Sequence, residues 1–387
     1  MTRRHGGRGA CEGAALDLLL LQELPRVGTL TMRRLLDRFG TAERALVAPF
    51  SDFAAVAGAA AARARTDPVR RESARRALAR AADLGARVET CEGDGYPDVL
   101  RRLADPPPVL FLRGREELLG RAPMVTVVGA RRATARGRGV AERVGIALAR
   151  VGVPVVSGMA LGIDGAAHVG AIRAAGDTVA VLGCGIDVAY PRAHRRLFER
   201  IASQGLLVTE FPPGTRAAPH HFPRRNRILA ALSTSTVVVE AGHRSGSRLT
   251  VDHALDMGKD VWAVPGPIDA SVCAGSNQFL IQGARPLISI DDFAETIIRE
   301  HQERMGGAPA GSHATPADSR TDAADPRADT GTLEERVLDA LAGDTLPIDE
   351  VAARFDISVS TALALLTTLE LHGEIVRMPG MRFRKAA

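Results

Sequence analysis

The chain has 387 residues, of which 45% are hydrophobic and 25% charged, so it is long enough for more than one domain with a packed core. Its net charge is +5, and its four cysteines lie far apart without a C-x-x-C pair, which argues against a zinc site or a disulfide framework and for reduced thiols. We find no signal peptide and no apolar run as long as a membrane span, and we expect a cytoplasmic protein that does not enter the membrane.

The charge is unevenly distributed along the chain. Residues 1–120 carry +4, residues 121–300 carry +6 and residues 301–387 carry −5. An anionic partner is therefore more plausible on the first two sections than on the third. Lys259 and Lys385 are the only lysines, so codon bias is an alternative explanation for the many arginines, and net charge alone does not predict DNA binding.

The N-terminal part predicts a small helical domain. We expect residues 1–14, which are rich in glycine and arginine, to be disordered. Residues 15–86 then read as helices, the first two joined at Pro25-Arg26-Val27-Gly28. This pair resembles a helix-hairpin-helix or SAM-like unit, which can hold a DNA phosphate on the N–H groups of a helix start. A plain helical pair without that role is the alternative, and the residues slightly favour it.

The middle of the chain alternates between short apolar runs and helical stretches. Each run is apolar throughout, which is typical of a strand covered on both faces. Alternating strands and helices predict a doubly wound, parallel, Rossmann-like α/β sheet, in a domain over residues 87–300 that begins with a connecting segment. The six runs are "MVTVVGAR", "VPVVSG", "TVAVLG", "LLVTEF", "TVVVEA" and "VWAVPG".

The C-terminal part predicts a linker and a second small domain. Residues 301–331 are rich in Gly, Ala, Pro and Asp, as linkers are. Residues 332–387 contain three helical stretches and "EIVRMPGMRFRK", which reads as a two-stranded wing. This is the pattern of a winged helix-turn-helix.

Glycine-rich and polar loops recur where the predicted parallel strands end. In an open α/β sheet, ligands bind outside the carboxyl ends of the strands, where backbone N–H groups and helix starts favour an anion. Arg225 and Arg227 precede the fifth strand, and Arg244 follows it, so we expect them near this edge. Neither a G-x-G-x-x-G fingerprint nor a Walker motif is present, so the pattern predicts a site for an extended anion.

Candidates for catalysis are few. Asp164 and His168 lie four residues apart on one predicted helical face, and we expect a local hydrogen bond between them. Glu210 and Glu240 end apolar strands, and we expect them to hold N–H groups of neighbouring loops. No nucleophile elbow and no H-E-x-x-H sequence is present, so we expect a binding protein rather than an enzyme, without cofactor or metal.

Eight motifs between about residues 125 and 285 together resemble the DNA-processing protein A family, called DprA or Smf. The resemblance implies a non-enzymatic protein that binds and protects single-stranded DNA, helps to load the RecA recombinase in natural transformation and recombination, and forms a homodimer. The motifs are "VGARRAT", "SGMALGIDGAAH", "TVAVLGCGIDVAYP", "TEFPPGT", "FPRRNRILAALS", "VVVEAGHRSGSRLTVDHAL", "VWAVPGPI" and "GSNQFLIQGA".

The resemblance and the loop pattern together give a set of expected DNA-binding residues. Three positions depart from the family's usual pattern: His194 replaces an asparagine, Thr209 a serine, and Arg248 an apolar residue. Phe222 is expected either to stack on a base or to pack beneath the helix that follows it. The expected DNA-binding residues are Arg131, Thr134, Ser157, Gly158, Gly183, Phe222, Arg225, Asn226, Arg227, Ser245, Gly246, Ser247 and Lys259.

Two other functions are weighed against this one. The related lysine-decarboxylase-like phosphoribohydrolases, which process nucleotides, carry P-G-G-x-G-T-x-x-E, whereas this chain has "PGPIDASVCAGSN" without the glutamate. A regulator of double-stranded DNA would use the winged unit, whose helix "SVSTALALLTTLELHG" has no arginine or lysine. Protein interaction or self-regulation fits that unit better.

Overall fold

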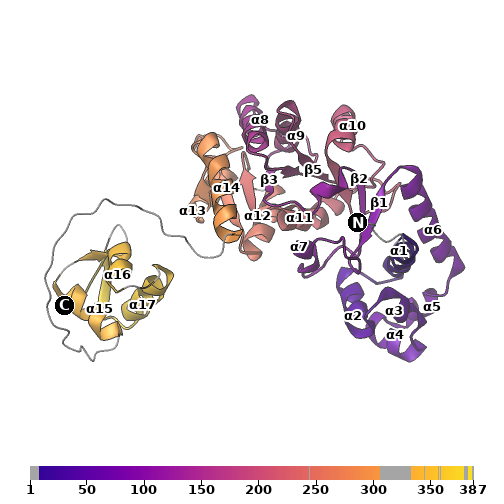
Figure 1. The fold of residues 1–387 in the computed structure, drawn as a ribbon, viewed down its shortest axis with the longest axis horizontal. Helices are drawn as coiled ribbons and strands as arrows, with labels where there is room; N and C mark the ends of the chain where they lie inside the picture. Colours follow the sequence, from indigo (N-terminus) through magenta and orange to yellow (C-terminus); the bar gives the residue numbers. More distant parts are fainter. Residues whose placement is uncertain are drawn as a thin grey trace, which may run out of the picture. The chain divides into compact units, whose positions relative to one another are not determined.

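The computed structural model of the chain describes residues 8–243, 245–305, 333–343, 345–355, 357, 359–378 and 382–385. The chain divides into two compact units, Met1–Ala310 and Gly311–Ala387 (Figure 1). Arg244 lies outside the described residues, and so do residues 306–331 of the expected linker. The first five residues of that expected linker belong to a helix of the first unit.

The first unit begins with six helices. Leu18 and Leu21 of the first helix are fully buried, as is Leu35 of the second, so the two helices join in one core. The prediction of disorder over residues 1–14 is wrong for residues 8–14, because this alanine-containing stretch extends a helix that the buried leucines anchor. The helices are α1 (Arg8–Gln22), α2 (Thr29–Phe39), α3 (Ala42–Val47), α4 (Phe50–Ala57), α5 (Ala59–Ala64) and α6 (Pro68–Asp83).

A nine-stranded sheet follows, in the order β1-β2-β6-β5-β4-β3-β7-β8-β9. All six predicted strands are present and mutually parallel, which confirms the doubly wound fold. The winding reverses at β3, which lies between β4 and β7. The six are β3 (Val125–Val128), β4 (Val155–Ser157), β5 (Thr178–Val181), β6 (Leu206–Thr209), β7 (Ser235–Val238) and β8 (Asp260–Ala263).

Three further strands widen the sheet at its edges. The connecting segment contributes β1 (Arg87–Thr90) and β2 (Val109–Gly114): β2 pairs antiparallel with β6, and β1 pairs antiparallel with β2. At the other edge, β9 (Arg285–Pro286) pairs with β8. The helices α1 to α6 lie at the β1–β2 end of the sheet (Figure 1).

Helices cover both faces of the sheet. On one face α8 and α9 pack on β3 and β4, and α14 packs on α8. On the other face α11 and α12 cover β4, β5 and β7 (Figure 1). The helices are α7 (Asp98–Arg101), α8 (Ala135–Arg150), α9 (Ile163–Arg173), α10 (Arg195–Gln204), α11 (His221–Leu232), α12 (Ser247–Asp256), α13 (Ala274–Ile281) and α14 (Ile290–Met305), with 3₁₀ turns at Glu116–Leu118 and Arg192–His194.

The second unit is a small winged helix, as predicted. Its antiparallel sheet has the order β10-β12-β11, and Val337, Leu366 and Phe383 are buried in its core. The elements are α15 (Leu333–Gly343), β10 (Leu346–Pro347), α16 (Ile348–Arg354), α17 (Val359–Leu371), β11 (Ile375–Met378) and β12 (Arg382–Lys385).

Within the described residues, none of the helices combines the length and apolar character needed to cross a membrane. The same residues contain no cluster of three or more His, Cys, Asp or Glu side chains that could hold a metal ion.

Glycine at position 170 sets the close approach of α9 to α8. A Cβ added to Gly170 would lie 2.1 Å from the backbone oxygen of Glu142 in α8. We expect Gly170→Ala to lower the free energy of unfolding of the first unit by about 1–3 kcal/mol, because the helices must move apart. Urea denaturation of the full chain, followed by circular dichroism, measures this.

Gly139→Ala is the matched control in the neighbouring helix. A Cβ there would lie 3.7 Å from a terminal nitrogen of Arg143, an ordinary contact. Alanine is the better helix former, so the control should stabilise the unit by about 0.5–1 kcal/mol. Equal transition midpoints for the two variants would contradict the packing argument.

Candidate nucleic-acid interface

The loops that follow β3, β4 and β7 meet at the point where the winding reverses. The N–H of Ala130, after β3, donates to the Glu240 backbone oxygen at 2.6 Å, and the N–H of Ile163, after β4, donates to the Ala130 oxygen at 3.3 Å. In folds of this kind the crevice at such a point is the usual ligand site. The three loops are therefore hydrogen-bonded to one another at the carboxyl edge.

The start of α8 is already occupied by a carboxylate of the chain itself. Glu240, which is 5% exposed, accepts the Thr134 N–H at 2.9 Å and the Thr134 hydroxyl at 2.6 Å. The Thr134 oxygen in turn caps α8 by accepting the Gly137 N–H at 2.9 Å. The expectation that Glu240 holds a loop N–H is confirmed. Because a Cβ on Gly137 would lie 2.2 Å from the Glu240 carboxyl carbon, the anion position at this helix start is filled.

Arg225 is a buried cation with an incomplete set of partners. It is 4% exposed, donates to the Val181 backbone oxygen, and has an Nε without a hydrogen-bond partner. It takes part in no ion pair within the described part of the chain. Burial lowers the pKa of Arg225 to about 10, and the nearby Asp164 partly offsets this. A buried guanidinium so placed is costly unless an anion completes it.

Glycine lets the Arg225 guanidinium lie directly against the loop after β4. A Cβ on Gly158 would lie 2.1 Å from the Arg225 Nη1 atom. The Asp164 carboxylate accepts the N–H groups of Gly158 at 3.2 Å and of Ala160 at 3.3 Å. Burial raises the pKa of Asp164, while Arg225 and these N–H groups oppose the rise. Gly158 and Arg225 are thus brought together at the edge, as expected.

Phe222 lies between a glycine loop and an arginine. A Cβ on Gly183 would lie 2.9 Å from the Phe222 ring, so the ring packs on that backbone. The exposed Arg131 places its Cζ 5.0 Å from the ring centroid, a cation–π distance, and Tyr190 lies 5.6 Å away. Tyr190, 43% exposed, is absent from the predicted set, although an aromatic residue in a loop at the ligand edge signals such a role.

Arg227 is a structural residue in this arrangement. It is 3% exposed, and its Nη1 and Nη2 atoms bind the two oxygens of the buried Glu210 at 2.7 and 2.9 Å. Its Nε lies 3.0 Å from an Asp105 carboxylate oxygen. Burial lowers the pKa of Arg227, but the bonds to Glu210 outweigh this and raise it. The prediction that Glu210 holds loop N–H groups is wrong, because two arginines take its oxygens: Arg224 donates to it at 2.8 Å.

The loop after β7 is held by a hydrogen bond between its own serines and by one from Asn226 of α11. The Ser245 and Ser247 hydroxyls are 2.7 Å apart, and the Asn226 amide donates to the Gly246 oxygen at 3.3 Å. Ser157 is fully buried and donates to the Val127 oxygen at 2.6 Å. The structure brings these predicted residues to the carboxyl edge, where their side chains shape the loops.

Lys259 lies at the opposite edge of the sheet. It precedes β8, and its ammonium donates to the backbone oxygens of Ala230, Ala231 and Ser233 at 2.6–2.8 Å. These carbonyls end α11, where a cation is favoured by the helix dipole. The structure therefore does not bring Lys259 together with the other predicted residues, since the residue before a strand sits at the strand's amino end.

The predicted hydrogen bond between Asp164 and His168 is wrong. His168 Nδ1 instead lies 2.7 Å from the Thr178 hydroxyl, while Asp164 turns toward the preceding loop. Burial lowers the pKa of His168 to about 3, so this imidazole is neutral. His194, one of the departures from the family pattern, places its Nδ1 3.0 Å from the Met159 oxygen and so supports the loop after β4.

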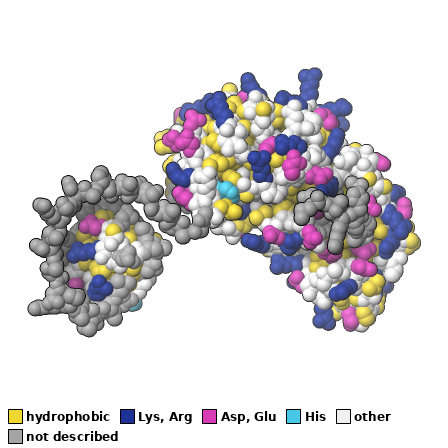
Figure 2. Space-filling model, in the orientation of Figure 1, with side chains coloured by type: hydrophobic (Ala, Val, Ile, Leu, Met, Phe, Trp, Pro, Cys, Tyr) yellow, Lys and Arg dark blue, Asp and Glu magenta, His cyan; other side chains and the backbone are white. Residues whose placement is uncertain are grey.

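Charge at the surface does not by itself mark the site. Figure 2 shows Lys and Arg side chains interspersed with Asp and Glu over the visible face of the first unit. What distinguishes the carboxyl edge is the placement of single groups. Arg131 is exposed there, while Arg225 is buried without an ionic partner among the described residues.

The two arginines with different surroundings predict different effects on stability. Arg227→Ala leaves the Glu210 carboxylate buried with only Arg224, and we expect a loss of roughly 3–5 kcal/mol in the free energy of unfolding. Arg131→Ala removes an exposed side chain and should change it by less than about 0.5 kcal/mol. Chemical denaturation of both variants checks this, and similar losses for the two would contradict the structural role of Arg227.

Comparison with known proteins agrees with this geometry. Residues 87–298 match the family described as DNA recombination-mediator protein A, and residues 321–381 match the DprA winged helix domain. The putative DNA processing protein DprA of Mycobacterium tuberculosis is 38% identical over 320 residues, which are 78% of this chain and 79% of that protein.

Two solved structures are similar to this chain. DprA from Streptococcus pneumoniae has a TM-score of 0.62 and 31% identity, and the match covers 71% of this chain and 94% of that one. DNA processing protein A from Helicobacter pylori has a TM-score of 0.51 and 28% identity, over 55% of this chain and 97% of that one. The fold, the loops at the carboxyl edge and these matches together show that the chain belongs to the DNA recombination-mediator protein A, or DprA, family.

Proposed function

We propose that this protein binds single-stranded DNA along the carboxyl edge of its parallel sheet. It protects the strand there and presents it to the RecA recombinase in the cytoplasm, during natural transformation and homologous recombination. The similar Helicobacter pylori protein has a single-stranded DNA binding mode, which supports this choice of ligand. Family membership supports a DNA-processing role, and the RecA partnership and a homodimer are part of the proposal on the same ground.

The buried Arg225 carries the proposal. Its guanidinium lies directly against Gly158 of the loop after β4, where backbone can approach a ligand closely, and Gly183 of the loop after β5 lies against the Phe222 ring. A phosphate at this point would complete a cation that the chain leaves without an ionic partner in its described part. Arg131, exposed above Phe222, extends the positive surface along the same edge. An arginine fork suits phosphate oxygens, since it can bind two at once.

A nucleotide-hydrolysing role is less well supported. Mononucleotide sites of this architecture use the helix start at the reversal point for phosphate. Here the Glu240 carboxylate fills the start of α8. His168, the one histidine among the considered catalytic groups, is fully buried and neutral. We therefore propose that the protein acts on DNA by binding and does not cleave or modify it.

Arg225→Met separates binding from folding. An apolar side chain of similar length removes a buried charge that forms no ion pair in the described residues, but it also leaves the buried Asp164 without this nearby cation, so the two effects on stability oppose each other, and a melting curve of the variant checks that it folds. We expect the affinity for a single-stranded oligonucleotide to fall roughly tenfold to a hundredfold, the scale of one charge-assisted hydrogen bond. Arg131→Ala should also weaken binding. It should reduce the slope of log affinity against log salt concentration, to which each phosphate contact on a single strand contributes about −0.7.

Arg75→Ala is the control for these two variants, because Arg75 is exposed on α6 and only loosely paired with Glu72 at 3.9 Å. Fluorescence anisotropy across a salt series measures all four proteins against single-stranded and duplex DNA. The proposal is wrong if wild-type protein binds duplex as tightly as single strands, or if Arg225→Met binds like Arg75→Ala.

A truncation after Met305 tests where the DNA-binding surface lies. The removed part includes the winged unit, and residues 301–387 carry −5, whereas residues 121–300 carry +6. All residues assigned to the edge lie in the first unit, so we expect most of the single-stranded DNA affinity to remain. If the truncated protein lost DNA binding but still melted at the temperature of the first unit in the full chain, the DNA-binding site would lie in the winged helix instead.

A further inference from the structure

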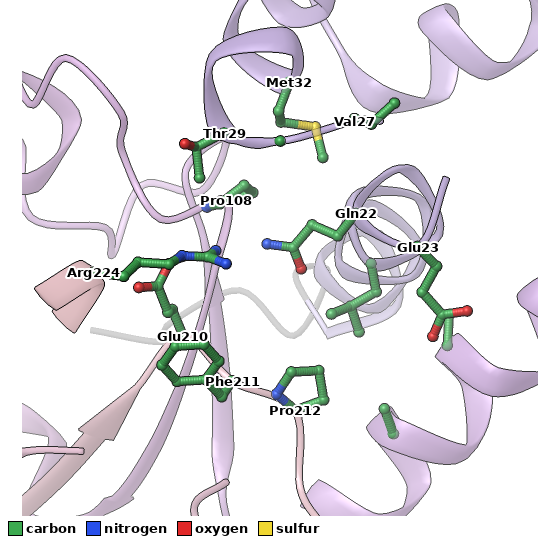
Figure 3. A pocket seen from close by; sticks show the side chains of 14 residues that line it. Gln22, Glu23, Val27, Thr29, Met32, Pro108, Glu210, Phe211, Pro212 and Arg224 are labelled. Carbon is green, nitrogen blue, oxygen red and sulfur yellow. The ribbon is translucent and has the colours of Figure 1, made fainter. Parts of the chain in front are cut away.

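A hollow of about 210 Å³ opens beside the carboxyl end of β6, between the sheet and the N-terminal helices. Its walls come from four parts of the chain: the α1–α2 hairpin, α6, the loop before β2, and the loop and helix after β6. Figure 3 shows the Gln22 amide and the Arg224 guanidinium pointing into this space from opposite sides. The hairpin that the sequence singled out is therefore one wall of a cavity.

Contacts between the helical part and the sheet hold these walls in place. Arg80 of α6 pairs with Asp187 in the loop after β5 at 2.5 Å, and Asp187 also accepts the Gly214 N–H at 2.7 Å. Arg33 of α2 donates to the backbone oxygens of Leu103 and Ala104 at 3.2 and 3.0 Å. The hollow is thus a built feature of the first unit.

The chemistry of the hollow suits a flat, neutral group. Val27, Met32 and Phe211 contribute apolar surface to its lining. The Arg224 charge is paired with Glu210 at 2.8 Å, and the Glu23 carboxylate adds negative charge nearby, so a phosphate would be disfavoured. A nucleobase has an apolar face and a hydrogen-bonding edge that the Gln22 amide, with both donor and acceptor, can match.

Aromatic and cationic groups connect the hollow with the DNA edge. Arg131 lies over Phe222, and Phe222 lies on Gly183. His221 follows: its Nδ1 lies 3.2 Å from the Gly183 oxygen, and its ring stacks on Phe211 with centroids 4.1 Å apart. Arg224 ends the series, with its Cζ 5.3 Å from the Phe211 ring. Such a row of rings and guanidinium groups is the kind of surface on which single strands lie.

We propose that the hollow receives one unstacked base of the DNA strand bound at the carboxyl edge. The base lies against the Arg224 plane and the apolar wall, with its edge toward Gln22. The inference rests on the proposed function, and it gives the N-terminal helices a part in binding the strand. Their hairpin holds a base, rather than a phosphate at the start of α2.

Gln22→Trp fills the hollow and tests the proposal on the full chain. The ligands are oligothymidylates of increasing length, each also made with a single 2-aminopurine, whose fluorescence reports stacking. We expect Gln22→Trp to weaken binding of long oligonucleotides about tenfold, the scale of one stacked base, and to leave the shortest ones unaffected. The 2-aminopurine signal at one end of the strand should disappear. Thr29→Trp blocks the same space from α2 and serves if Gln22→Trp does not fold.

Gln204→Trp is the matched control, since Gln204 is exposed and also ends its helix, α10, at the opposite edge of the sheet. Suppose that wild-type protein binds single-stranded DNA and that Arg131→Ala lowers this affinity. If both blocking variants then bind oligonucleotides of every length as Gln204→Trp does, the hollow is not a base site. If wild-type protein binds no single strand, the proposed function itself fails. Saturable binding of free deoxynucleotide that Gln22→Trp abolishes, with oligonucleotide binding unchanged, would also overturn the proposal.

Discussion

Helix α11 is fixed by charged groups at both of its ends, and the candidate site depends on that. Near its start, the buried Glu210 carboxylate takes both terminal nitrogens of Arg227 and ties the helix to β6. At its end, the Lys259 ammonium donates hydrogen bonds to three backbone carbonyl oxygens. A helix restrained in this way cannot rotate or slide without breaking a buried ion pair, which is costly. Phe222 and Arg225 are therefore held at fixed positions on the carboxyl edge.

The three arginines of α11 have different roles because of helical geometry. Arg224 and Arg227 are three residues apart, so they face the same way and share Glu210. Arg225 is turned about 100° from its neighbour and points instead toward Gly158 and Val181. One short sequence thus supplies a structural clamp and a buried cation that can serve a ligand. The ion pair of Arg227 with Glu210 stabilises α11, and this stabilisation offsets the cost of burying Arg225, which forms no ion pair in the described residues.

The sequence predicted the features that depend on residues close together in the chain. The six parallel strands and the winged unit follow from periodicity, and the carboxyl edge follows from the rule for open sheets. The antiparallel β2 was missed because its pairing with β6 joins residues about a hundred positions apart, and β1 was missed with it because β1 pairs with β2 alone. The partners of Glu210 and the hydrogen bond of His168 to Thr178 depend on tertiary packing in the same way. The place of Lys259 could have been predicted, since a residue that precedes a parallel strand lies at the amino edge.

The chain's own carboxylates decide where an anion can enter. Glu240 occupies the start of α8, and Glu210 and Asp105 together pair with Arg224 and Arg227, so two of the positions that attract phosphate in such folds are closed. Arg225 and the exposed Arg131 form no ion pair within the described part of the chain. Arg225 lies against Gly158, Phe222 lies against Gly183, and Arg131 lies over the Phe222 ring. On the proposed function, a strand that passes along these loops would meet both arginines and the row of rings that leads to the hollow.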